Sequence, residues 1–203
     1  MNGYLQTVSA MTAFVNIAEM VHGSEIYGPG SRTVIWVQGC TLACKGCWNQ
    51  DLWPTQGGRN HTVESLIERV KQVGDEGITL MGGEPLQQAP MILELIKKAG
   101  IEDLSIMLYS GYEEKELNPI QTKCVELSDI VILGRYIEHL RDTSLRWRGS
   151  SNQVVRYPTE RHRSVSSIEE NNVEIHMDEN GKLKILGYPE KEFVRLFFDD
   201  NHL

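Results

Sequence analysis

The sequence has no long apolar run and no excess of basic charge. None of its 203 residues belong to an apolar stretch of the ~18 residues that a membrane helix needs, and the first residues do not have the basic-then-apolar pattern of a signal peptide. With 20 Lys and Arg against 28 Asp and Glu, the formal net charge is −8. The chain therefore lacks the positive field that neutralises phosphate backbones. We expect a cytoplasmic protein with neither nucleic acid nor a membrane as partner.

Cysteine is also scarce. Four cysteines are too few for a disulfide scaffold at this length, and three of them, Cys40, Cys44 and Cys47, lie close together in the sequence. Composition is otherwise that of a globular protein, with 40% hydrophobic and 24% charged residues. The clustered cysteines predict metal ligation within one folded domain.

Short apolar runs alternate with amphipathic stretches. Strands are predicted at 33–38, 77–81, 104–109 and 129–133, and helices at 61–73 and 90–99, the second ending at Gly100. This order predicts an α/β fold with a parallel sheet, either doubly wound or curled into a partial barrel. The loops that begin at Cys40, Gly82, Ser110 and Gly134 then gather at the carboxyl ends of the strands, where ligands bind in such folds.

The C-terminal residues differ in character. A polar stretch begins at about Ser164, and two apolar segments flank Asp178–Gly181, a pattern typical of a β-hairpin. We expect a core domain at 1–163 and a small extension at 164–203 that packs on it.

The cysteine spacing C-x3-C-x2-C places three thiolates on one loop. A structural zinc site needs four ligands, and the nearest histidines are His61 and His22. A four-iron cluster held by three thiolates instead leaves one iron open to a substrate or cofactor. A zinc loop closed by one histidine, or three buried cysteines without metal, remain as alternatives.

Gly82-Gly83-Glu84-Pro85 follows a predicted strand directly. Glycines at such a position let the backbone approach a ligand closely, although a Gly-Gly turn before a helix is common in α/β proteins.

Together these motifs resemble the radical S-adenosylmethionine (SAM) superfamily. Further likenesses lie at 28–32, 39–49, 109–112 and 147–153, the last reading WRGSSNQ. They are similar to the activating enzymes of glycyl-radical proteins, and WRGSSNQ is similar to those that serve anaerobic, class III ribonucleotide reductase. The resemblance implies a partial (β/α)6-type barrel that binds a [4Fe-4S] cluster and SAM. It also implies reductive SAM cleavage and abstraction of a glycine α-hydrogen on a partner enzyme.

The resemblance also implies the roles of individual residues. Cys40, Cys44 and Cys47 hold the cluster, and Gly82, Gly83 and Glu84 meet the methionine end of SAM. Further contacts to SAM are expected from Gly46, Trp48, Asn49, Tyr109, Ser110 and Arg135. The chain departs from the activase pattern at Leu133-Gly134-Arg135, where Asp-Gly-Lys is typical, so that Arg135 alone reaches towards the SAM carboxylate or ribose.

Several alternatives stay open. The implied partner is a glycyl-radical enzyme, anaerobic ribonucleotide reductase by the likeness, with flavodoxin or ferredoxin as reductant. One rival is a radical SAM enzyme that acts on a small molecule such as a deazapurine precursor, and another is a non-catalytic zinc- or cluster-binding adaptor.

A basic segment and three isolated residues are also open to interpretation. The segment 135–163 has seven arginines and three acids, and it is either a docking strip for a partner or an ordinary solvated face. Cys124 is expected to be a buried hydrophobe and Trp36 a core residue. Tyr109 fits packing and the SAM pocket equally.

Overall fold

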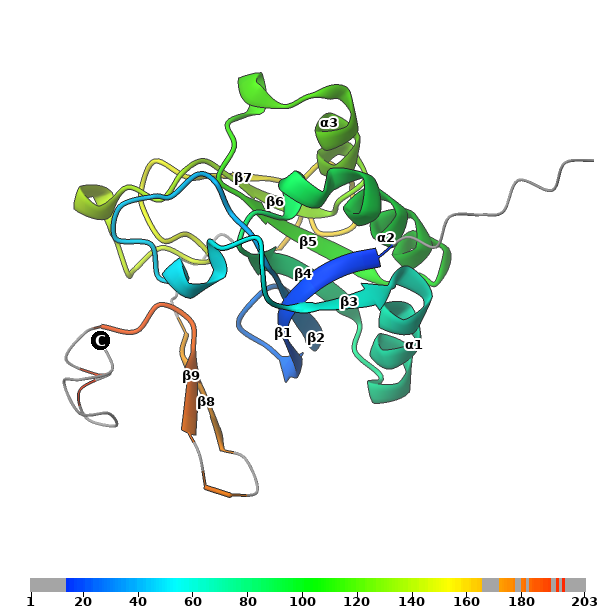
Figure 1. Ribbon diagram of the computed structural model, residues 1–203, viewed down its shortest axis with the longest axis horizontal. Helices are drawn as coiled ribbons and strands as arrows, with labels where there is room; N and C mark the ends of the chain where they lie inside the picture. Colours follow the sequence, from blue (N-terminus) through cyan, green and yellow to red (C-terminus); the bar gives the residue numbers. More distant parts are fainter. Residues whose placement is uncertain are drawn as a thin grey trace, which may run out of the picture.

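Seven strands form the central sheet of the protein (Figure 1). A computed structural model describes residues 14–165, 172–177, 180–181, 183–190, 193 and 195. The strands are β1 (Phe14–Ser24), β2 (Arg32–Val37), β3 (Arg59–Thr62), β4 (Gly77–Gly82), β5 (Ser105–Ser110), β6 (Ile130–Leu133) and β7 (Val154–Arg156). Their order is β3-β1-β2-β4-β5-β6-β7. The central strands β2, β4, β5 and β6 are parallel, and β1, β3 and β7 add antiparallel edges.

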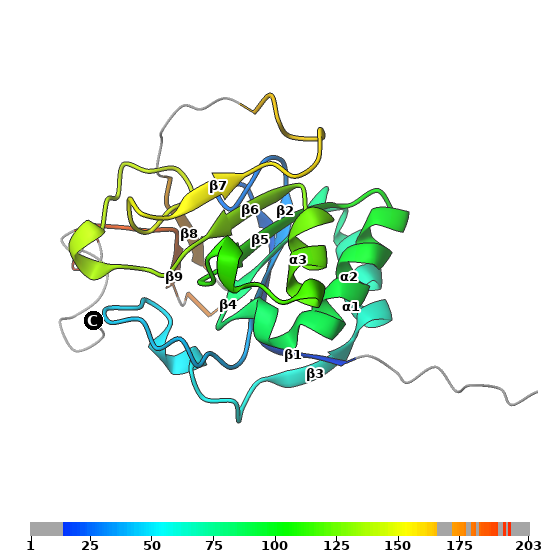
Figure 2. The same cartoon turned by 90° about the horizontal axis from the view of Figure 1, so that it is seen from above.

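Three helices cover one face of this sheet, as Figure 2 shows. They are α1 (Val63–Val73), α2 (Ala89–Ile101) and α3 (Pro119–Glu126). Because side chains alternate along a strand, each central strand contributes to two cores. In β2, for example, Ile35 packs towards the helices while Trp36 packs on the opposite face with Met107 and Trp147. Apolar side chains on both faces explain why these strands were visible as continuous apolar runs.

The four predicted strands match β2, β4, β5 and β6 to within one residue at each end. The first helix begins at Val63 rather than at His61, because Thr62 caps it by accepting a hydrogen bond from the Ser65 N–H. The second helix does not stop at Gly100 but runs to Ile101. Its end is set by Asp103, which has a left-handed φ of 57° and lets the Leu104 N–H donate to the Ala99 carbonyl.

The observed architecture is a mixed α/β fold with a parallel sheet. The described residues contain four parallel strands, flanked by antiparallel β1, β3 and β7, which the sequence did not reveal. β1 and β3 are only partly buried, so neither gives a continuous apolar run. None of the helices in the described residues is long and apolar enough to cross a membrane.

The C-terminal segment forms a separate two-stranded antiparallel sheet, β8 (Glu174–Met177) and β9 (Leu183–Leu186). It contacts the main sheet at defined points: Lys184 pairs with Glu19 of β1, and Leu186 is buried in the core beside Trp36. Asp178 and Glu179 of the expected turn lie outside the described residues.

A buried arginine joins the amino-terminal ends of three central strands. Arg32 of β2 is fully buried, and its guanidinium donates to the hydroxyls of Thr79 and Ser105 and to the carbonyls of Pro29, Ile78 and Ser105. Burial lowers its pKa to about 10. The arginine thus fastens β2 to β4 and β5 at the end of the sheet opposite the cysteine loop.

Candidate functional site

The loops that follow the parallel strands lie at one end of the sheet (Figure 2). They line a pocket of about 660 Å³ that is partly open to solvent. All three clustered cysteines line it. The remaining lining residues are Leu42, Asn49, Trp53, Met81, Gly82, Gly83, Glu84, Tyr109, Ser110, Gly111, Gly134, Tyr136, Gln153 and Tyr188. The sequence-based expectation that the unusual loops converge is confirmed by this lining.

Backbone hydrogen bonds shape the cysteine loop. The Cys40 N–H donates to the Trp53 carbonyl (3.0 Å), which closes the base of the loop, and the Cys47 N–H donates to the Cys44 carbonyl (3.0 Å). The Asn49 N–H lies 3.4 Å from the Cys47 sulfur. All three cysteines are free and half-exposed. Burial raises the pKa of the Cys40 and Cys44 thiols, so a cation is needed to stabilise their thiolates.

The donor set fits a cluster better than a single ion. Among the described residues, no three His, Cys, Asp or Glu side chains are placed to share one metal ion. His61 lies in β3 at the edge of the sheet, and His22 bonds to Thr33 near the start of β2, so neither lines the pocket. A cube of iron and sulfide uses a different iron for each thiolate, so its three ligands need not converge on one point. The arrangement therefore fits an iron–sulfur cluster, and the described residues supply no fourth ligand for a closed zinc site.

The glycine loop packs directly on the cysteine loop. The Gly83 N–H donates to the Val37 carbonyl (2.8 Å), and the Glu84 N–H donates to the Gly39 carbonyl (2.9 Å). A Cβ at Gly83 would lie 2.2 Å from the Gly39 carbonyl oxygen. A Cβ at Gly82, whose φ is +109°, would lie 2.6 Å from the Trp36 Cα. Both glycines are thus needed for the loops after β2 and β4 to touch.

Glu84 joins the loops after β4 and β5. Its carboxylate is 2% exposed and accepts hydrogen bonds from the Leu86 N–H, the Ser110 hydroxyl and the Gly111 N–H, at 2.7–2.9 Å. Burial raises its pKa to about 7, although these three donors act in the opposite direction. Its position inside the pocket wall makes it a residue that sets the shape of the site.

The WRGSSNQ segment fixes the loop after β6. Gln153 accepts from the Gly149 N–H and donates to the Gly134 carbonyl, while Asn152 donates to the Arg135 carbonyl. The Ser150 hydroxyl accepts from the Ile137 N–H. These contacts are between segments of the chain itself, so the motif holds the Gly134 loop at the rim of the pocket.

Six of the nine residues expected to contact SAM line the pocket: Asn49, Gly82, Gly83, Glu84, Tyr109 and Ser110. Gly46 packs beside Glu138. The Trp48 ring centroid lies 5.6 Å from the Arg141 guanidinium carbon. A guanidinium nitrogen of Arg135 lies 2.6 Å from a carboxylate oxygen of Glu116. These last three do not line the pocket.

Tyr136 and Tyr188 are pocket residues that sequence reasoning missed. Tyr188 follows β9, and no motif connects it with the cysteines. The tertiary fold brings it to the site: a Cβ added at Gly149 would lie 3.2 Å from its ring.

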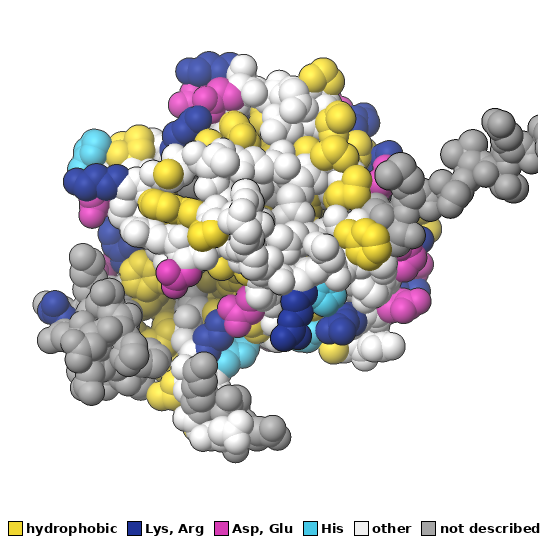
Figure 3. Space-filling view, viewed as in Figure 1, with side chains coloured by type: hydrophobic (Ala, Val, Ile, Leu, Met, Phe, Trp, Pro, Cys, Tyr) yellow, Lys and Arg dark blue, Asp and Glu magenta, His cyan; other side chains and the backbone are white. Residues whose placement is uncertain are grey.

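The arginine-rich segment is largely neutralised within the chain. Arg135, Arg156, Arg161 and Arg163 pair with Glu116, Glu114, Asp103 and Glu160. On the face shown in Figure 3, basic and acidic side chains adjoin one another around the rim. This pairing favours the solvated-face interpretation over a basic docking strip. Cys124 and Trp36 are buried in the two cores, as predicted.

Comparison with known proteins defines the class. Residues 26–156 match the family described as a 4Fe-4S single cluster domain. The chain is 36% identical over 141 residues to an anaerobic ribonucleoside-triphosphate reductase-activating protein of Escherichia coli strain K12, which covers 65% of this chain and 92% of the relative. A protein of the same name from Vibrio cholerae is 34% identical over 139 residues, which cover 64% of this chain and 90% of the relative. One from Enterobacteria phage T4 is 34% identical over 135 residues, which cover 63% of this chain and 85% of the relative. The chain therefore belongs to the 4Fe-4S single cluster domain family and, within it, to the anaerobic ribonucleoside-triphosphate reductase-activating proteins.

A solved structure, QueE from Escherichia coli, is 16% identical and covers 57% of this chain and 68% of its own, with a TM-score of 0.43. This likeness is too low to carry a functional argument.

Proposed function

We propose that the protein is a radical SAM activase that generates a glycyl radical on anaerobic ribonucleotide reductase. The proposal is carried by three free cysteines that share one pocket with a glycine loop, in a chain that covers 92% of a curated activating protein. A reduced [4Fe-4S] cluster and SAM supply, when bound, a 5′-deoxyadenosyl radical able to take the α-hydrogen of a glycine.

The residues of the chain bind and orient in this scheme. Cys40, Cys44 and Cys47 would hold the cluster through their three thiolates. The bare backbone of Gly82 and Gly83 lies beside them, which supports contacts to the amino and carboxylate groups of SAM. Glu84 and Ser110 keep the two neighbouring loops in place.

The finer assignments extend this proposal. Trp48, Gly46 and Arg135 lie outside the pocket lining, so their contact with SAM requires either that SAM extends beyond this lining or that their loops shift. The sheet serves as a shortened partial barrel of the (β/α)6 type, with residues 164–203 as an extension packed on a core at 1–163. Flavodoxin or ferredoxin is the reductant, and the protein works in the cytoplasm.

A reconstitution experiment tests the proposal. Protein loaded anaerobically with iron and sulfide, then given dithionite and SAM, is expected to release 5′-deoxyadenosine. With anaerobic ribonucleotide reductase present, a glycyl doublet is expected in the electron paramagnetic resonance spectrum. Cys44→Ser is expected to abolish both signals, while Cys124→Ala, in the helical core, is the matched control that keeps them. Zinc without sulfide in the purified protein, or turnover by Cys44→Ser, contradicts the assignment.

A further inference from the structure

The segment after β8 builds a wall of the site that the family match does not include. Residues Lys184–Tyr188 line a groove of about 790 Å³ together with Trp48 and Leu52, which follow the cysteines, and Trp36 of β2. The family match ends at residue 156, so this wall is an addition to the shared core.

The groove lies next to the cluster pocket. Asn49, Met81 and Tyr188 line both spaces, so the two adjoin at these residues. Lys184 and Glu19, whose side chains pair at 2.6 Å, also line the groove.

The groove follows the edge of a strand. Three consecutive residues of β9, Lys184, Ile185 and Leu186, line it, although neighbouring side chains of a strand point to opposite faces. The edge of the β9 segment, and not one of its faces, therefore borders the groove. At roughly 3.3 Å per residue the edge of β9, Leu183–Leu186, is about 10 Å long, enough for about three residues of an extended chain. In the described part of the chain, β9 pairs with β8 alone, so its second edge is open to another strand.

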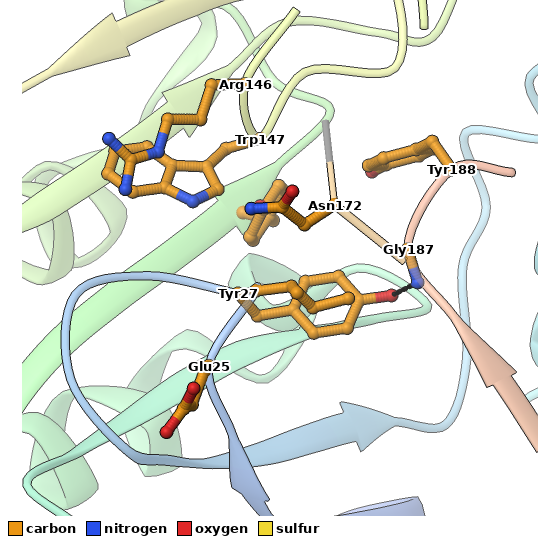
Figure 4. A pocket seen from close by; sticks show the side chains of 9 residues that line it. Glu25, Tyr27, Arg146, Trp147, Asn172, Gly187 and Tyr188 are labelled. Carbon is orange, nitrogen blue, oxygen red and sulfur yellow. Dashed lines mark hydrogen bonds between the residues drawn. The ribbon is translucent and has the colours of Figure 1, made fainter. Parts of the chain in front are cut away.

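Hydrogen bonds to the core hold the segment that follows β9. Figure 4 shows the Gly187 N–H donating to the Tyr27 hydroxyl, at 2.9 Å, with Trp147 and Tyr188 lining a small cavity behind it. The Arg141 guanidinium donates to the Pro189 carbonyl at 2.9 Å. These contacts fix the segment on the core before any partner arrives.

We propose that this groove receives an extended, glycine-containing segment of the partner protein, which pairs along β9 and brings its glycine past Tyr188 to the cluster pocket. An open strand edge recognises extended backbone through main-chain hydrogen bonds. A glycine has no side chain to obstruct passage at the narrow junction with the pocket. The inference rests on the proposed function, because it concerns delivery of the glycine to that same site.

The test uses two substitutions at paired positions of the small sheet. Ile185 lines the groove, and Ile175 is its cross-strand partner on β8, which does not line it. Ile185→Arg and Ile175→Arg place the same charge on the same face of the sheet, one strand apart. Each full-length variant is assayed for iron content, for 5′-deoxyadenosine without partner, and for the KM of anaerobic ribonucleotide reductase in glycyl-radical formation.

Ile185→Arg is expected to keep the iron content and partner-free SAM cleavage of the wild type but to raise the KM for the reductase at least about tenfold, a loss of about 1.4 kcal/mol. Ile175→Arg is expected to behave as wild type in all three assays. An unchanged KM for Ile185→Arg, or an equal rise in both variants, overturns the inference.

Hydrogen exchange separates this inference from the proposed function. Amides of Leu183–Leu186 that point away from β8 are expected to exchange more slowly when the reductase is added, while those of β8 keep their rate. If the wild type releases no 5′-deoxyadenosine, the proposed function fails. The exchange experiment still decides the inference: slower exchange in β9 supports binding of the partner in the groove, and unchanged exchange refutes it.

Discussion

Substitution of Gly83 by alanine tests the contact between the two loops that form the pocket. The added Cβ would lie 2.2 Å from the Gly39 carbonyl oxygen and 2.8 Å from its carbon, and both are backbone atoms next to Cys40. Ordinary contacts between carbon and a carbonyl oxygen are at about 3.3–3.6 Å, so the loops must separate by about 1 Å. Overpacking of this kind costs about 1–3 kcal/mol, and loss of the Glu84–Gly39 hydrogen bond adds about 1 kcal/mol.

The expected result is a melting temperature lower by roughly 4–16 °C in the iron-free protein, from about 2–4 kcal/mol in a domain of this size. Iron bound per chain after reconstitution is expected to fall as well, because Cys40 moves with Gly39. Gly100→Ala is the control: it lies in α2 with no atom within 4 Å of the added Cβ and is expected to gain up to about 1 kcal/mol. Thermal unfolding and iron analysis measure both variants. Wild-type stability and full iron loading in Gly83→Ala would refute the reasoning.

Three further predictions concern the framework of the site. Arg32→Met leaves several buried acceptors without a donor and is expected to cost at least about 3 kcal/mol in urea unfolding; a loss under about 1 kcal/mol contradicts the role assigned to the guanidinium. Because burial raises the pKa of Glu84 to about 7, the folded state holds its proton more tightly than the unfolded chain. Stability of the iron-free protein from this group is therefore full below about pH 4.5 and decreases as the pH rises to 7. A Glu84→Gln variant should lose that slope in unfolding measured across this range, and an unchanged slope would assign it to other groups. Gln153→Ala removes the hydrogen bonds to Gly134 and Gly149 and is expected to reduce SAM cleavage while leaving iron content intact; full cleavage would show that the Gly134 loop holds its place without them.

The sequence revealed the parts of the fold that are buried on both sides. β2, β4, β5 and β6 are continuous apolar runs because both faces of each are covered. β1 and β3 escaped notice because their strand character depends on pairing with residues far away in the chain. Gly100 was misread as a helix stop because the left-handed position is taken by Asp103, a residue that adopts this conformation less often than glycine.

The candidate site likewise contains residues that local sequence patterns identify and residues that only the tertiary fold brings there. Residues fixed by local spacing, the three cysteines and Gly82-Gly83-Glu84, were found from the sequence and share the pocket. Arg135 was expected to reach towards SAM; its guanidinium pairs with Glu116, a tertiary neighbour that local spacing does not indicate, and the residue is not part of the pocket lining. Tyr188 was missed because a segment remote in sequence brings it to the rim, which spacing alone does not encode.

The position of Arg32 has a consequence for how such a protein can change. Its hydrogen bonds tie the central strands together at one end, while the cysteines and glycines occupy the other end of the same strands. The amino-terminal ends of the strands are thus the rigid end of the sheet, and the carboxyl-terminal ends bear the reactive site. Loops at the carboxyl-terminal ends can be lengthened or shortened, or covered by an added segment such as β8 and β9, without weakening the hydrogen bonds that join the strands.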